Sequence, residues 1–199
     1  MNKRESNKQM LVDLLYVVPQ LKLYYSDNSN FNKLISFLSE KDYCALDDLP
    51  YPTFKEVSDQ TGLSVGVVRK MVKKMYNELL TLENEHFLNF NRIEIVFLAV
   101  FDNRIAVFRT NKIEILPRVG ETVEVPFFKA RLGVSLFFVE RIKHSFQGDV
   151  QRIYIDLTSG IYNMFWHYRL DKALSTGEIG IQELISLNDR EIKHKLGIY

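Results

Sequence analysis

Apolar residues recur at helical spacing in the first part of the chain and alternate in short runs in the second, with the change near residue 85. One helix is predicted by four apolar residues at positions i, i+3, i+4 and i+7, which are Phe31, Leu34, Ile35 and Leu38. We expect Ser29 or Asn30 to cap it. Three more helices are predicted: Lys8 to Val18, ended by Pro19; Phe54 to Thr61; and Ser64 to about Leu80.

The second part is predicted to be rich in β-strands. Ile93 to Phe101 and Ile105 to Arg109 flank Asp102 and Asn103, which tolerate the positive φ of a two-residue hairpin turn. Four further strands or alternating runs are expected: 113–115, 123–125, Val134 to Ile142, and Val150 to Leu157. About six strands in roughly 70 residues are typical of a small barrel or sandwich. Glu178 to Leu196 is expected to form one or two short helices.

These patterns predict an α+β protein with two parts. Residues 1–88 are expected to form a helical bundle. Residues 89–199 are expected to form a small antiparallel β-barrel or sandwich, followed by the short C-terminal helices. The strand rhythm of this second part is loosely similar to that of SH3-like barrels.

Composition limits the classes of protein and of site. The chain has 199 residues, 46% of them hydrophobic, and a formal net charge of +1, so it has no global basic field. A single cysteine, Cys44, excludes an internal disulfide framework and a cysteine-rich zinc site. There is no apolar run of 18 residues, and the N-terminus is polar. We therefore expect a cytoplasmic protein with no membrane span.

One segment, residues 53–74, has the pattern of two short helices joined by a tight turn. Thr53 and Glu56 have the spacing of a capping box, Gly62 can adopt the positive φ of a sharp turn, and Ser64 can cap the next helix. This segment resembles a helix-turn-helix, with Ser58 and Thr61 where that family has alanine and an apolar residue. The resemblance implies that the second helix enters the major groove of double-stranded DNA.

The resemblance also implies a set of DNA-binding residues. They are Thr53, Lys55, Ser64, Val65, Arg69, Lys70, Lys73 and Lys74. An arginine can contact guanine bidentately, so Arg69 is expected to contact a base, whereas the lysines are expected to hold phosphates. Residues 1–90 hold 11 Lys and Arg against 12 Asp and Glu, so the positive charge is local to one helix. The alternative is that this helix is an ordinary solvated surface.

A hairpin soon follows the second helix, as in winged relatives of this family. Arg104 and Arg109 lie on it and are candidate wing residues, although they could equally decorate the polar face of a barrel. The expected function is therefore that of a DNA-binding transcriptional regulator. Such regulators commonly act as dimers, because one helix contacts few base pairs. The β-rich part could dimerise, bind an effector, or recruit a protein whose identity the sequence does not disclose.

Catalytic and metal-binding patterns are absent from the sequence. His86, His144, His167 and His194 have no metal-ligand spacing, and no phosphate-binding glycine loop or nucleophile motif occurs. We therefore expect no enzyme activity, metal or cofactor. Aromatic residues gather at 162–168, where they could form a binding platform or the hydrophobic core of a barrel. The alternative function is accordingly a protein-interaction or scaffold module that uses the aromatic β-rich part.

Overall fold

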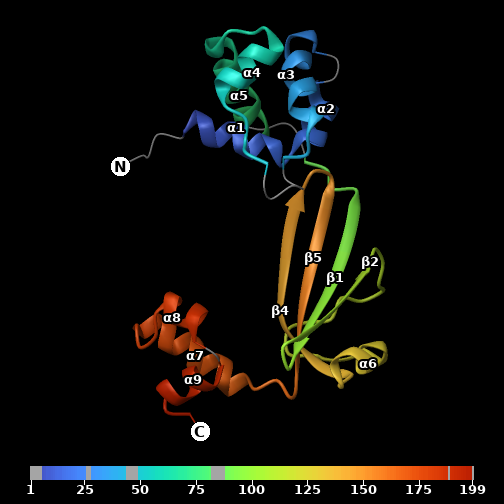
Figure 1. Ribbon diagram of the computed structural model, residues 1–199, viewed down its shortest axis with the longest axis vertical. Coiled ribbons are helices and arrows are strands. Elements are labelled where there is room, and N and C mark those ends of the chain that lie inside the picture. The colour runs from blue at the N-terminus through green and yellow to red at the C-terminus, as the bar shows by residue number, and fades with distance from the viewer. Residues whose placement is uncertain (1–5, 26–27, 44–48, 82–87, 188, 199) are drawn as a thin grey trace. The chain divides into compact units, whose positions relative to one another are not determined.

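The structure is a computed structural model that describes residues 6–25, 28–43, 49–81, 88–187 and 189–198 (Figure 1). Cys44, His86 and the predicted change of pattern at residue 85 lie outside the described residues. The chain is an α+β protein in which helices precede the strands, as predicted.

The described residues of the N-terminal part form five helices: α1 (Asn7–Leu15), α2 (Val18–Tyr25), α3 (Ser29–Glu40), α4 (Phe54–Thr61) and α5 (Val65–Leu80). Their apolar faces meet in one core. Its fully buried members include Leu11, Leu14, Leu21, Leu34, Val57, Val68, Val72 and Met75. The predicted apolar face of α3 is confirmed, because all four of its residues are buried in this core.

The sequence prediction was wrong at the first helix and at one cap. Pro19 does not end the chain's helical run, because it lies in the first turn of α2, where the missing N–H of proline has no helical partner to lose. The predicted helix Lys8 to Val18 instead ends at Leu15 as α1, and Val18 is the first residue of α2. The cap of α3 is Asn28, whose side chain accepts a hydrogen bond from the N–H of Asn30.

Five strands form one sheet in the order β2-β1-β5-β4-β3: β1 (Arg92–Phe101), β2 (Arg104–Thr110), β3 (Thr122–Glu124), β4 (Leu136–Gln147) and β5 (Val150–Ser159). Asp102 and Asn103 have φ values of 49° and 58°, so the predicted hairpin turn is confirmed. At the far edge, β3 pairs antiparallel with β4, with Val123 opposite Phe137.

The predicted antiparallel barrel or sandwich is not observed. The sheet is mixed and open, and β2 and β3 are its edges. The Arg92 N–H donates to the Asp149 carbonyl at the start of both β1 and β5, so these strands begin side by side (Figure 1). The hairpins β1–β2 and β4–β5 lie side by side in the sheet through β1 and β5, which are neighbours and run parallel. A meander of short antiparallel strands would contain no parallel pair.

The link between β2 and β4 also differs from its prediction. Residues 113–115 form no strand, and Phe127 and Phe128 lie in a 3-10 helix, η1 (Pro126–Phe128), followed by α6 (Lys129–Leu132). Phe128 is buried, and its ring meets those of Phe108 and Phe137. Phe127 is 66% exposed.

The C-terminal segment contains α7 (Met164–Thr176), α8 (Ile181–Ser186) and α9 (Asp189–Lys195). One or two short helices were predicted at its end, where α8 and α9 are found, whereas α7 was missed. The aromatic residues 162–168 therefore lie largely on a helix rather than inside a barrel. Trp166 is buried with Ala173, Ile179, Ile192 and Leu196, while Phe165 and Tyr168 are exposed.

Contacts divide the chain into two compact units. The first contains residues 1–96, 109–113 and 143–154, and the second contains 97–108, 114–142 and 155–199. The helices α1–α5 thus share a unit with the beginnings of β1 and β5 and the end of β4.

Candidate nucleic-acid interface

The first helix of the predicted motif, α4, begins with a complete capping box. The Thr53 hydroxyl accepts a hydrogen bond from the Glu56 N–H, and the Glu56 carboxylate accepts one from the Thr53 N–H at 2.6 Å. These bonds lower the pKa of Glu56, so its carboxylate is charged near neutral pH. The box uses two of the N–H groups at this end, which leaves those of Phe54 and Lys55 for an outside acceptor.

The turn between α4 and α5 has internal hydrogen bonds from the two residues that depart from the family pattern. Gly62 has a φ of 71°, and its N–H donates to the Ser58 carbonyl. The Ser58 hydroxyl donates to the Leu63 carbonyl at 2.6 Å, and the Leu63 N–H donates to the Thr61 hydroxyl at 3.3 Å. Ser58 and Thr61 therefore stabilise the turn rather than disrupt it.

The second helix, α5, has one buried and one basic face. Ser64 caps it by accepting from the Val67 N–H, as predicted. The buried stripe consists of Val68, Val72, Met75 and Leu79. Arg69, Lys70, Lys73 and Lys74 are all exposed. A rotation of 100° per residue places Lys70 almost directly opposite the buried stripe, with Lys73 beside it.

The four cations differ in their surroundings. The Arg69 guanidinium lies 5.4 Å from the centre of the Phe54 ring, which holds it beside the N-terminal end of α4. Lys74 lies 5.5 Å from the Phe31 ring centre and 3.6 Å from the Glu78 carboxylate. Within the described residues, no hydrogen bond or ion pair involves Lys70 or Lys73. These two lysines are the cations most available to an anionic ligand.

Glu78, the partner of Lys74, also contacts the helical core. Its carboxylate accepts a hydrogen bond from the Tyr25 hydroxyl at 2.5 Å. Burial and this carboxylate raise the pKa of Tyr25. Glu78 thus ties α5 to α2 and neutralises Lys74, while Lys70 and Lys73 keep their charge unopposed.

Ser64 and Gly66 are exposed and Val65 is half-buried in the first turn of α5, so a groove-bound helix would present small side chains there. The two candidate wing residues, Arg104 and Arg109, belong to different units. Arg109 belongs to the unit that contains α4 and α5, whereas Arg104 belongs to the other unit. Arg104 lies 3.6 Å from Asp102 and donates to the Arg131 carbonyl. The hairpin that carries them is part of the five-stranded sheet.

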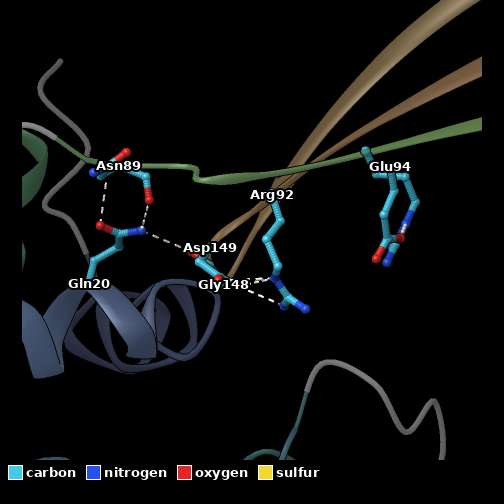
Figure 2. A network of polar contacts seen from close by, with 7 residues as sticks. Gln20, Asn89, Arg92, Glu94, Gly148 and Asp149 are labelled. Atoms are coloured by element: carbon cyan, nitrogen blue, oxygen red, sulfur yellow. Dashed lines mark hydrogen bonds and ion pairs between the residues drawn. The ribbon is translucent and has the colours of Figure 1, made fainter. Parts of the chain in front are cut away.

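A buried glutamine connects the helices to the strands of the same unit (Figure 2). Gln20 is 2% exposed, and its amide donates to the carbonyls of Asn89 and Gly148 and accepts from the Asn89 N–H. Beside it, Arg92 forms a bidentate ion pair with Asp149 at 2.8–3.2 Å, which lowers the pKa of Asp149. The sequence analysis overlooked Gln20, because a polar residue gives no apolar periodicity to detect.

Histidines and acidic side chains are the groups from which a metal or catalytic site could be built. No group of three or more His, Cys, Asp or Glu in the described residues could hold a metal ion. His144 bonds to Gln151, and His167 stacks on Tyr162 with ring centres 4.5 Å apart. These histidines are thus engaged in local contacts. No helix in the described ranges has both the length and the apolar character needed to cross a membrane.

Comparison with known proteins finds no match: no family model, no curated protein and no solved structure is significantly similar to this chain. Function therefore has to be inferred from the residues and their arrangement.

Proposed function

We propose that this protein binds double-stranded DNA through α4 and α5 and regulates transcription. The observation that carries the proposal is the pair Lys70 and Lys73, exposed on the outer face of a helix that follows a tight, internally bonded turn. A helix in this position fits the major groove, and its cations would neutralise phosphates that flank the groove.

Each candidate residue has a role in this proposal. Lys70 and Lys73 hold phosphates, and Arg69, steadied by Phe54, contacts a base edge or a phosphate beside α4. The free N–H of Lys55 adds a further phosphate contact next to Thr53. Ser64 and Val65 approach the bases. Lys74 contributes least, because Glu78 already neutralises it.

The proposed role is that of a binding protein rather than an enzyme, in the cytoplasm with the DNA, and it needs no metal or cofactor. One helix contacts few base pairs, so a homodimer that binds two half-sites is part of the proposal.

The test is binding to a fluorescein-labelled random duplex, measured by fluorescence anisotropy at several salt concentrations. Three phosphate contacts predict a slope of about −2.7 in log K against log salt, or about a 40-fold loss of affinity between 50 and 200 mM. In the double variant Lys70→Ala/Lys73→Ala, the slope should fall to about −0.9.

A matched control removes the same charge elsewhere in this unit. Lys8→Ala/Lys33→Ala changes two exposed lysines on α1 and α3, and it should keep the slope of the original protein. The proposal is wrong if the protein does not bind DNA at low salt, or if both double variants change the slope equally.

A further inference from the structure

The strand β2 is an edge of the sheet, and part of its outer side is free to pair with another strand. In an antiparallel hairpin with a two-residue turn, Phe101 and Arg104 bond to each other, so alternate residues of β2 point their N–H and C=O groups outward. Arg131 confirms this parity, because its Nε donates to the Ile105 carbonyl from outside the sheet. The N–H and C=O of Val107, two residues on, therefore also face outward.

A cavity with an apolar lining lies against this strand within the same unit. It has a volume of about 540 Å³, and its lining comprises Ile105, Ala106, Val107, Phe108, Phe127, Phe128 and Arg131. Phe127 is 66% exposed, and its ring meets those of Phe108 and Phe128 at 5.3 Å between centres. Ile105 and Val107 are about half exposed, at 50% and 44%. These large apolar groups gather beside unpaired backbone, which is the arrangement an added strand requires.

The rim of this cavity is basic. Two hydrogen bonds connect α6 to β2 here: Arg104 donates to the Arg131 carbonyl, and Arg131 donates to the Ile105 carbonyl. Lys129 is exposed two residues before Arg131 on α6 and adds a further positive charge near it in the chain. Among the described residues, the only ion pair of this group is the contact of Arg104 with the exposed Asp102. The positive charge of Arg131 therefore lies at the Ile105 end of the unpaired part of β2.

We propose that β2 binds an extended peptide that pairs with the backbone at Val107, places an apolar side chain in the cavity at Phe127, and sets an acidic group against Arg131. The order of the free backbone, the cavity and the arginine along β2 determines the order of the matching groups along the peptide. Because Arg131 covers the backbone at Ile105, pairing stops there, and the carboxylate of the peptide lies next to its apolar anchor. This inference stands beside the proposed DNA binding and does not depend on it.

The charge of the rim selects this occupant. A second copy paired through β2 would bring together two sets of Arg104, Lys129 and Arg131. Among the described residues only Arg104 of this set has an acidic partner, the exposed Asp102, so the like charges would repel. A nucleic acid would satisfy the cations but would leave the outward backbone of Val107 and the exposed ring of Phe127 unused. An acidic peptide satisfies all three features.

The test uses a fluorescein-labelled octapeptide of alternating threonine and valine that ends in phenylalanine and aspartate, with its binding measured by anisotropy to the full-length protein. We expect a Kd on the order of 10 μM. Changing the aspartate to asparagine with an amidated C-terminus should weaken binding about tenfold. Two intermediate peptides, each with only the side-chain or only the C-terminal carboxylate, identify which acid Arg131 binds. Methylating alternate peptide N–H groups should abolish binding, because it removes the backbone pairing.

Protein variants locate the site. Phe127→Ala should weaken binding about tenfold, and Arg131→Gln should remove the preference for the acidic peptide. Leu136→Ala is the matched control, since Leu136 is a 54% exposed apolar residue of the same unit that does not line the cavity. Binding equal for the acidic, neutral and methylated peptides, or no binding below about 1 mM, would overturn the proposal. Self-association that Phe127→Ala abolishes, or competition by duplex DNA that Arg131→Gln abolishes, would overturn it in favour of another occupant.

Discussion

Replacing Gln20 with leucine should weaken the connection between the helices and the strands of the first unit. The side chain is buried and forms three hydrogen bonds, at 2.5 and 3.2 Å to the carbonyls of Asn89 and Gly148 and at 3.0 Å from the Asn89 N–H. Leucine has a similar volume, so the change removes the bonds without leaving a large cavity. All three lost partners are backbone groups, which leucine cannot satisfy.

The magnitude follows from these bonds. A typical intramolecular hydrogen bond contributes about 1 kcal/mol net, and a buried group left unpaired costs about 1–3 kcal/mol. Because Asn89 is exposed and Gly148 is half-buried, water can replace part of the loss. Burial of the apolar leucine side chain stabilises the folded state and offsets part of this loss. We therefore expect Gln20→Leu to lower the free energy of unfolding by about 2–3 kcal/mol.

Urea denaturation followed by far-UV circular dichroism measures this change. With an m-value of about 2 kcal/mol/M, the midpoint should fall by about 1–1.5 M. Gln60→Leu is the matched control, because Gln60 is exposed on α4, and its midpoint should stay within about 0.3 M of the original. If Gln20→Leu unfolds at the same urea concentration as the control, the network of Figure 2 does not stabilise the unit.

Two further predictions concern the helix-turn-helix segment. Gly62→Ala should lower the free energy of unfolding by about 1 kcal/mol, because Gly62 has positive φ, and Gly62→Asn should cost less, since asparagine tolerates this region better; equal losses in urea denaturation would contradict the reasoning. Thr53→Ala should cost about 1 kcal/mol at neutral pH. The lowered pKa of Glu56 means that the capping box stabilises the folded state when this carboxylate is charged, and that its contribution is lost as the pH falls through the pKa of Glu56 in the folded protein. The difference in stability between Glu56→Gln and the original protein should therefore shrink in acid, and a difference independent of pH would argue against the box.

Features set by local chemistry could be predicted from the sequence. The capping box at Thr53, the positive φ of Gly62 and the hairpin turn at Asp102 each depend on a few neighbouring residues, and all three are observed. Helix α5 was predicted to within a residue, because its apolar spacing and its Ser64 cap agree. The exposure of Arg69, Lys70, Lys73 and Lys74 follows from the same spacing.

Features set by long-range contacts could not be predicted in this way. The parallel neighbours β1 and β5 are far apart in sequence, and their local patterns do not specify an open sheet over a barrel. The hydrogen bond from Tyr25 to Glu78 joins α2 and α5, two helices that no spacing rule connects. Arg131 covers the Ile105 carbonyl only because α6 lies beside β2. Helix α7 was missed because its aromatic cluster was interpreted as a binding platform or as the core of a barrel.

The most direct test of DNA binding through α5 is a titration of isotope-labelled protein with a random duplex, followed by nuclear magnetic resonance of the backbone amides. Gly66 and Lys70 lie on the exposed face of this helix, so their amide signals should shift most, together with those of Lys73 and Lys55, and the shifts should diminish at high salt. Shifts confined to the strands and to α7–α9, with those of α5 unchanged, would contradict the proposed interface.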